Sequence, residues 1–104
     1  MEILDVETED RNGLVHVALK GELDLSTVAK VQDELRRVEE GEPPVMVLDL
    51  SRLTFLDSTG LGAIVHGWRL AADHGRVLQI TDASPAIRRL LKVTGLEDLL
   101  EPQP

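Results

Sequence analysis

Residues 45–65 read VMVLDLSRLTFLDSTGLGAIV, and this stretch decides how the chain folds. It begins with the continuous apolar run Val45–Leu48, which is typical of a strand buried on both faces. From Leu61 onward the apolar residues recur at helical spacing, which predicts a helix that closes near His74. The residues from Leu50 to Leu56 are expected to form a loop. The stretch is therefore a strand, a loop and a helix in succession.

Three further segments are predicted to be strands. They are Ile3–Thr8, Leu14–Lys20 and Val77–Ile80, and large apolar residues fall at every other position of the second. Asn12-Gly13 lies between the first two and accepts the positive φ angles that a tight hairpin turn requires. The first two strands are therefore expected to pair antiparallel.

Two further helices are predicted on either side of the opening stretch. An apolar stripe with helical spacing runs from Val28 to Val38. Asp24 or Ser26 is expected to cap this helix, and Gly41 is expected to end it. Ser84-Pro85 has the form of a helix start, with a capping hydroxyl followed by proline at the first helical position.

The predicted order is β-β-α-β-α-β-α, in which helices return the chain between strands. Such alternation favours a single α/β domain, here residues 1–104, built on a parallel or mixed sheet of four to five strands with helices. Leu96 to Leu100 is expected to supply a last short turn or strand.

Two predicted loops are expected to meet at one edge of this sheet. One runs from Gly21 to Ser26 after the second strand, and the other from Asp49 to Thr59 after the third. If these strands are parallel, their carboxyl ends share an edge, because crossovers in such sheets are right-handed. Asp24 and Ser58 should then lie at the same edge, where open α/β sheets tend to bind ligands.

Composition excludes several classes of function. The chain of 104 residues carries a net charge of −8, which disfavours direct binding to nucleic acid. No stretch approaches the length of about 20 apolar residues that spans a bilayer, and the acidic start is unlike a signal peptide, so we expect a cytoplasmic protein without membrane insertion. The absence of cysteine excludes disulfides and thiolate chemistry.

No enzyme or metal motif stands out. The three histidines, His16, His66 and His74, are scattered, so neither a metal site nor a cofactor is expected. Leu56 occupies the first glycine position of a hydrolase nucleophile elbow around Ser58, and no phosphate-binding P-loop sequence is present.

The tetrapeptide Asp57-Ser58-Thr59-Gly60 has two interpretations. Asp, Ser and Thr are favoured helix N-caps, so a purely structural role suffices for them. However, Gly60, Gly62 and Gly67 lie within or beside the predicted helix, where each costs about 1 kcal/mol relative to alanine. These glycines would let another backbone approach closely, and packing of the helix onto its own sheet explains them nearly as well.

Three segments resemble one known family. GELDLSTV at residues 21–28, VLDLSRLTFLDSTGLGAIV at 47–65 and SPAIRRLLKVTGL at 84–96 are similar to STAS domains of the anti-sigma factor antagonist type. The resemblance implies the STAS fold of SpoIIAA-like proteins. Family members commonly continue into a further C-terminal helix, whereas this sequence stops at Pro104.

The resemblance also implies a function and a site. In the family, the serine that corresponds to Ser58 is phosphorylated by an anti-sigma factor that is also a serine kinase, and a serine phosphatase is expected to reset it. The unmodified antagonist binds the anti-sigma factor and frees the sigma factor, whereas the phosphorylated form is released. The expected partner-binding residues are Asp24, Asp57, Ser58, Thr59, Gly60 and Gly62.

This interpretation describes a partner-switching phosphoprotein that regulates transcription and is not itself an enzyme. An alternative is a STAS component of a stress-signalling scaffold or of a lipid-transport complex. A third possibility, from another class, is an enzyme that binds or hydrolyses a nucleotide at the same edge.

Overall fold

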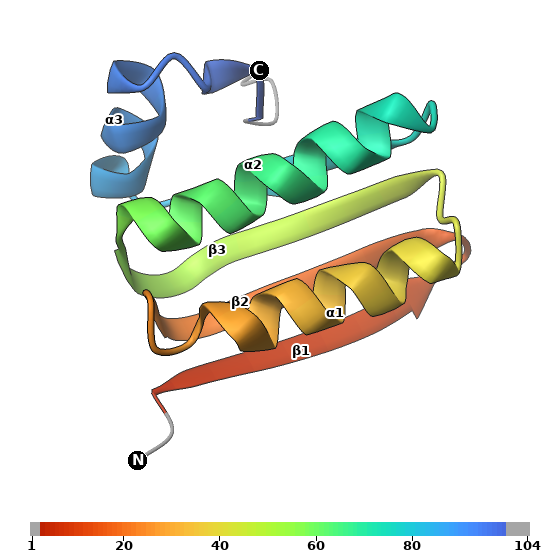
Figure 1. Cartoon of the computed structure of the whole chain (residues 1–104), viewed down its shortest axis with the longest axis horizontal. Coiled ribbons are helices and arrows are strands. Elements are labelled where there is room, and N and C mark those ends of the chain that lie inside the picture. Colours follow the sequence, from red (N-terminus) through yellow and green to blue (C-terminus); the bar gives the residue numbers. More distant parts are fainter. Residues whose placement is uncertain (1–2, 100–104) are drawn as a thin grey trace.

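Seven helices and strands and a final 3₁₀ turn follow one another along residues 3–99, which are the residues that this computed structural model describes (Figure 1). Their order confirms the predicted alternation. The elements are β1 (Leu4–Arg11), β2 (Leu14–Leu23), α1 (Val28–Glu40), β3 (Val45–Leu56), α2 (Ser58–Asp73), β4 (Val77–Thr81), α3 (Pro85–Val93) and the 3₁₀ helix η1 (Glu97–Leu99).

Within the described residues the sheet has four strands in the order β1-β2-β3-β4. β1 pairs with β2 antiparallel, and β2, β3 and β4 are mutually parallel, so the prediction of a mixed sheet is confirmed. Asn12 and Gly13 form the hairpin turn with φ angles of 57° and 86°. The segment predicted as a turn or strand begins as η1, and Leu100 lies outside the described residues.

The two crossover helices, α1 and α2, lie side by side over the same face of the sheet (Figure 1). The crossovers from β2 to β3 and from β3 to β4 step in the same direction, and right-handed connections then place both helices on one face. The core lies between these helices and the sheet. Fully buried side chains there include Val17, Leu19, Leu48, Ile64, Leu78 and Ile80.

The opposite face of the sheet is more polar and only partly buried. Its side chains include His16 and Ala18 from β2, Val47 and Asp49 from β3, and Gln79 from β4. The prediction that Val45–Leu48 is buried on both faces was therefore wrong. Met46 and Leu48 are buried against the helices, whereas Val45 and Val47 are only half-buried.

β3 is longer than expected, because the predicted loop from Leu50 to Leu56 continues the strand. The extension pairs with the end of β2, where Glu22 lies opposite Phe55 and Leu23 opposite Leu56. Register shifts interrupt this pairing between Ala18 and Lys20 and again between Gly21 and Glu22. Such irregularities break the two-residue alternation, which is why the periodicity of the sequence did not indicate a strand.

The predicted capping of α1 by Asp24 or Ser26 was wrong, because the N-cap residue is Thr27, whose side chain makes no capping bond. Thr27 Oγ1 instead donates to the Glu22 carbonyl at 2.8 Å and accepts from the Asp24 N–H at 3.0 Å. The Asp24 carboxylate accepts from the backbone N–H and the hydroxyl of Ser26, at 2.9 and 2.6 Å. These side chains therefore fix the loop before the helix.

Candidate functional site

The candidate site forms where β3 ends and α2 begins. Asp57 is the N-cap of α2, and its Oδ1 accepts a hydrogen bond from the Gly60 N–H at 2.8 Å. Its Oδ2 accepts another from the Leu25 N–H at 3.2 Å, and its own N–H donates to the Leu23 carbonyl. One aspartate therefore holds the two loops together. This arrangement confirms that the segments carrying Asp24 and Ser58 lie at the same edge.

Ser58 and Thr59 are both exposed, at the first two positions of α2. The first backbone N–H groups of a helix have no acceptor within the helix, and the Asp57 side chain accepts from that of Gly60. The helix dipole adds a partial positive charge at this end. The Ser58 hydroxyl is therefore accessible from solvent in surroundings that tolerate an added anion.

The three glycines of α2 have different surroundings. Gly60 is buried, and a Cβ there would lie 2.6 Å from Leu23 Cγ and 2.9 Å from the Leu23 carbonyl oxygen. At Gly67 a Cβ would lie 3.1 Å from Leu35 Cδ1, whereas at Gly62 it would face open space. Packing within the chain therefore accounts for Gly60 and Gly67. Of the three, Gly62 alone is exposed, with open space where a Cβ would lie.

Asp24 adds negative charge to the same edge. Hydrogen bonds from Ser26, first of all from its hydroxyl, lower the pKa of the Asp24 carboxyl below its usual value. The carboxyl is thus ionised at neutral pH. With the Asp57 side chain, it makes this part of the surface acidic.

Two exposed apolar residues at this edge were not among the residues predicted from the sequence. The residues Leu25 and Phe55 are 75% and 48% exposed. Leu25 precedes the apolar stripe of α1, which begins at Val28. An apolar residue outside the buried stripe is the feature of the sequence that could have indicated its exposure. Phe55 carried no comparable signal, because the strand that contains it was interpreted as a loop.

The histidines lie away from this edge. His16 Nε2 is 3.6 Å from Asp49 Oδ2 on the partly buried sheet face, and His74 Nδ1 is 3.9 Å from Glu39 Oε1 near the end of α2. Among the described residues, no three His, Asp or Glu side chains are grouped in a way that could hold a metal ion.

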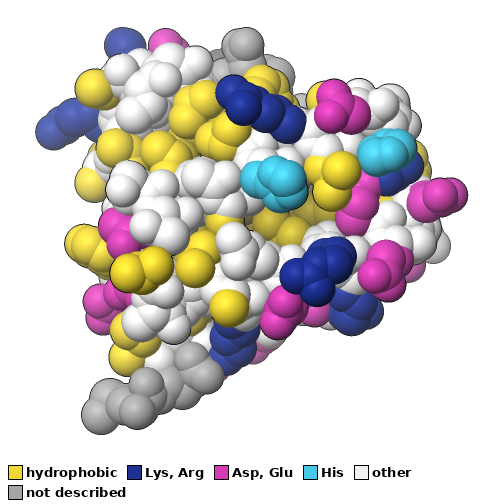
Figure 2. Space-filling model, in the orientation of Figure 1, with side chains coloured by type: hydrophobic (Ala, Val, Ile, Leu, Met, Phe, Trp, Pro, Cys, Tyr) yellow, Lys and Arg dark blue, Asp and Glu magenta, His cyan; other side chains and the backbone are white. Residues whose placement is uncertain are grey.

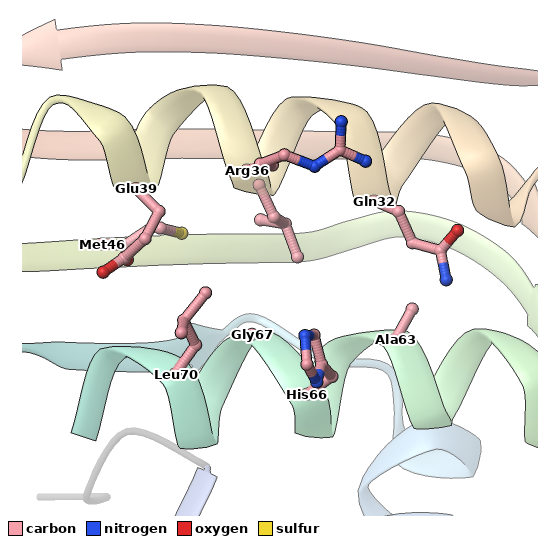
Figure 3. A pocket seen from close by; sticks show the side chains of 9 residues that line it. Gln32, Arg36, Glu39, Met46, Ala63, His66, Gly67 and Leu70 are labelled. Carbon is pink, nitrogen blue, oxygen red and sulfur yellow. The ribbon is translucent and has the colours of Figure 1, made fainter. Parts of the chain in front are cut away.

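A hollow of about 330 Å³ opens between α1 and α2. Figure 2 shows hydrophobic side chains in this region, bordered by basic, acidic and histidine side chains. The lining residues project from both helices and from β3 (Figure 3); they are Gln32, Leu35, Arg36, Glu39, Met46, Ala63, His66, Gly67 and Leu70. None of the predicted site residues lines this hollow.

The description "Mlab, STAS domain" belongs to a family model that matches residues 7–101. The chain therefore belongs to the STAS domain family, as its sequence resemblance suggested. No helix within residues 3–99 is long and apolar enough to cross a membrane.

Individual relatives and solved structures of the family are also similar to this chain. The chain is 34% identical over 94 residues to an anti-sigma F factor antagonist of Paenibacillus polymyxa, covering 89% of this chain and 80% of the relative. It superposes on the crystal structure of an anti-sigma factor antagonist from Mycobacterium paratuberculosis with a TM-score of 0.85 and 28% identity, covering 96% of this chain and 86% of the other. The phosphorylated form of the Bacillus cell fate determinant SpoIIAA gives a TM-score of 0.73 at 25% identity, covering 96% and 92%.

Proposed function

We propose that this chain is a cytoplasmic, non-enzymatic anti-sigma factor antagonist that is switched by phosphorylation of Ser58. The observation that carries the proposal is an exposed serine at the first position of α2, at the edge where the β2–α1 and β3–α2 junctions meet. The named functions of the relatives support the choice of partner. In this proposal, the unmodified chain binds an anti-sigma factor with serine kinase activity, and a serine phosphatase restores the binding form.

In the proposed switch, phosphorylation changes the charge of the docking surface and leaves the fold unchanged. A phosphate brings about −1.5 to −2 charges, which the start of a helix accommodates. On the docking surface, however, that charge would meet any carboxylate that the partner brings close to Asp24 and Asp57. Two unit charges about 5 Å apart at an effective dielectric near 20 repel by roughly 3 kcal/mol before screening. A partner must also strip water from the phosphate, so phosphorylation favours release.

Phosphorylation itself is tested with candidate anti-sigma factors of the host and ATP. The wild-type chain should gain one phosphoryl group by intact mass, and peptide mapping should locate it at Ser58. Ser58→Ala should gain none. Ser51→Ala, at an exposed serine outside the predicted partner-binding residues, is the matched control that should still be modified. Modification at another residue, with Ser58 untouched under every kinase tried, would contradict the proposal.

Binding tests the role of charge. Ser58→Ala should retain the anti-sigma factor, and Ser58→Asp should weaken binding about tenfold or more, since about 1.4 kcal/mol corresponds to a factor of ten. Ser51→Asp introduces the same charge at another exposed serine and should bind like wild type. Equal affinities of the Ser58→Ala and Ser58→Asp variants would count against charge as the cause of release.

The enzyme alternative has a separate test. The isolated chain is incubated with ATP or GTP, and released phosphate is measured. We expect no turnover above background, and turnover lost in Ser58→Ala would favour the nucleotide-hydrolysing alternative instead.

A further inference from the structure

The hollow between α1 and α2 lies outside the surface that the proposed function uses. Its lining residues come from the middle of the two helices and from β3, and none belongs to the edge around Ser58. Its volume of about 330 Å³ falls at the lower end of the range of about 300 to 1,000 Å³ that is typical of small-molecule sites. The hollow is therefore large enough to hold a small ligand.

The floor of the hollow is apolar. Leu35 of α1, Met46 of β3 and Ala63 of α2 line it, and all three are buried. Leu70 adds a partly buried apolar side chain from the next turns of α2 (Figure 3). Ala63 contributes only a methyl group, so the space above it stays open. An apolar group that entered the hollow would leave water for an apolar surface, which is favourable.

Hydrogen-bond donors gather at one end of the hollow. Gln32 and Arg36 are four residues apart and so share one face of α1, and His66 of α2 faces them (Figure 3). The Arg36 guanidinium donates to Asp33 Oδ1 at 3.0 Å, in an ion pair in which both side chains are largely exposed. A guanidinium has five N–H donors, so this bond leaves others for a ligand. This end of the hollow is suited to a carboxylate.

The other end of the hollow carries an acid. Glu39 follows Gln32 by seven residues, which is about 10 Å along the helix. The Glu39 carboxylate pairs with Arg76, which is not among the lining residues. The lining side chains at this end, those of Glu39, Met46 and Leu70, offer no donor to a second anionic group (Figure 3). The hollow therefore favours a molecule with one anionic end and an apolar remainder.

We propose that the hollow between α1 and α2 binds a small monocarboxylate with an apolar chain. Its carboxylate would accept hydrogen bonds at Gln32, Arg36 and His66, and its chain would lie over the floor. Carbon–carbon bonds of about 1.5 Å advance an extended chain by about 1.3 Å per atom, so about eight carbons span the length of the hollow. This inference goes beyond the proposed function and does not depend on it, because such binding requires neither Ser58 nor a protein partner.

Octanoate is the probe that tests the proposal. It is titrated into the isotope-labelled full chain, and the backbone amide signals are followed by NMR. Signals of residues 32–39 and 63–70 should shift saturably, with a dissociation constant of about 1 mM or below. Octanedioate has the same number of carbons and a second carboxylate, which would meet Glu39. It should bind at least about fivefold more weakly.

Three variants test where octanoate binds. Ala63→Leu should weaken binding at least about tenfold, because the new side chain takes the place of several methylene groups of the probe. Arg36→Gln removes the guanidinium and should weaken binding about fivefold or more. Arg69→Gln is the matched control, since it removes the same charge from an exposed residue of α2 outside the hollow. It should leave the affinity within about twofold of wild type.

Thermal unfolding of each variant checks that the fold is retained. Arg36 is exposed, so Arg36→Gln tests the site even if the buried substitution Ala63→Leu prevents folding. Absence of saturable shifts, or shifts confined to residues outside the hollow, would overturn the proposal. Equal affinities for octanoate and octanedioate, or equal losses in Arg36→Gln and Arg69→Gln, would overturn it as well.

A second copy of the chain is the other candidate occupant. In that case the same amide signals would move with protein concentration before any octanoate is added, and this result would also overturn the proposal. None of these measurements involves phosphorylation of Ser58 or an anti-sigma factor. Failure of the ligand proposal therefore leaves the proposed function standing, and failure of the proposed function leaves the ligand proposal standing.

Discussion

The carboxylate of Asp57 accepts a hydrogen bond from the backbone N–H of Leu25, 32 residues earlier in the chain. Its other oxygen caps α2 at Gly60. The start of the helix and the loop before α1 are thus joined by one side chain. The polar motif that Asp57 begins therefore has a definite structural task in addition to the function proposed for its neighbour Ser58.

Removal of the Asp57 side chain should destabilise the protein. Asp57→Ala loses both hydrogen bonds, and we expect the free energy of unfolding to fall by about 1 to 2 kcal/mol, in the range of lost N-caps. Asp57→Asn keeps an acceptor oxygen for Gly60 and should retain most of the stability. Urea denaturation compares the three proteins. Wild-type stability in Asp57→Ala would show that the cap contributes nothing.

Gly60 and Gly62 should respond in opposite ways to the same change. In Gly60→Ala the new Cβ meets the side chain and carbonyl of Leu23, and we expect a loss of about 1 to 3 kcal/mol in the free energy of unfolding. In Gly62→Ala the Cβ meets open space, and higher helix propensity should add up to about 1 kcal/mol. Thermal or urea unfolding measures both, and equal effects would contradict the packing of α2 on Leu23.

A negative charge at Ser58 should not weaken the fold. Ser58→Asp places an acid in the first turn of α2, where the helix dipole is favourable, and stability should stay equal or rise by about 0.5 kcal/mol. The measurement is chemical denaturation at low and high salt, with Ser51→Asp as the control for added charge. Marked destabilisation would mean that loss of binding in this variant reflects unfolding.

Glu34 on α1 should make stability depend on acid pH. Hydrogen bonds from Arg37, and then from Thr8, lower the pKa of the Glu34 carboxyl to about 2 in the folded protein. Its contribution is therefore fully present above the unfolded value near 4.5 and is lost as the pH falls towards 2. Glu34→Gln should cost about 1 kcal/mol at pH 7, because Arg37 is largely exposed, and little at pH 2.

Stability of wild type and variant is compared by urea denaturation across this pH range. Asp33→Asn is the matched control, since Asp33 forms an i,i+3 pair with Arg36 in which both side chains are largely exposed. That variant should lose less than about 0.5 kcal/mol at pH 7. A constant difference between wild type and Glu34→Gln from pH 7 to pH 2 would contradict the predicted linkage.

Local sequence patterns predicted most of the fold because the elements carry clear signals. Asn12-Gly13 indicated the hairpin, and Ser84-Pro85 marked the start of α3, where the Ser84 hydroxyl accepts from the Ile87 N–H as expected. The extension of β3 to Leu56 could not be predicted in this way. Its pairing with β2 shifts register twice, and periodicity carries no information about such shifts.

The sequence indicates those parts of the candidate site that depend on the types of neighbouring residues, and not those that depend on long-range contacts. The Asp57-Ser58 pair stood out because these residues favour helix starts, whereas the bond from Leu25 to Asp57 joins segments that are distant in sequence. The same limit applies to Gly60. The sequence showed that a glycine lies unusually near the start of a helix. Only the packed structure shows that its neighbour is Leu23 of the same chain.

The close fit of Gly60 against Leu23 bears on how the proposed phosphorylation switch would store its signal. A contact without spare room leaves α2 little freedom to move against Leu23. In the function proposed above, the signal would therefore be stored in the covalent bond to Ser58 and not in a second conformation. Only an enzyme that makes or breaks that bond would then change it.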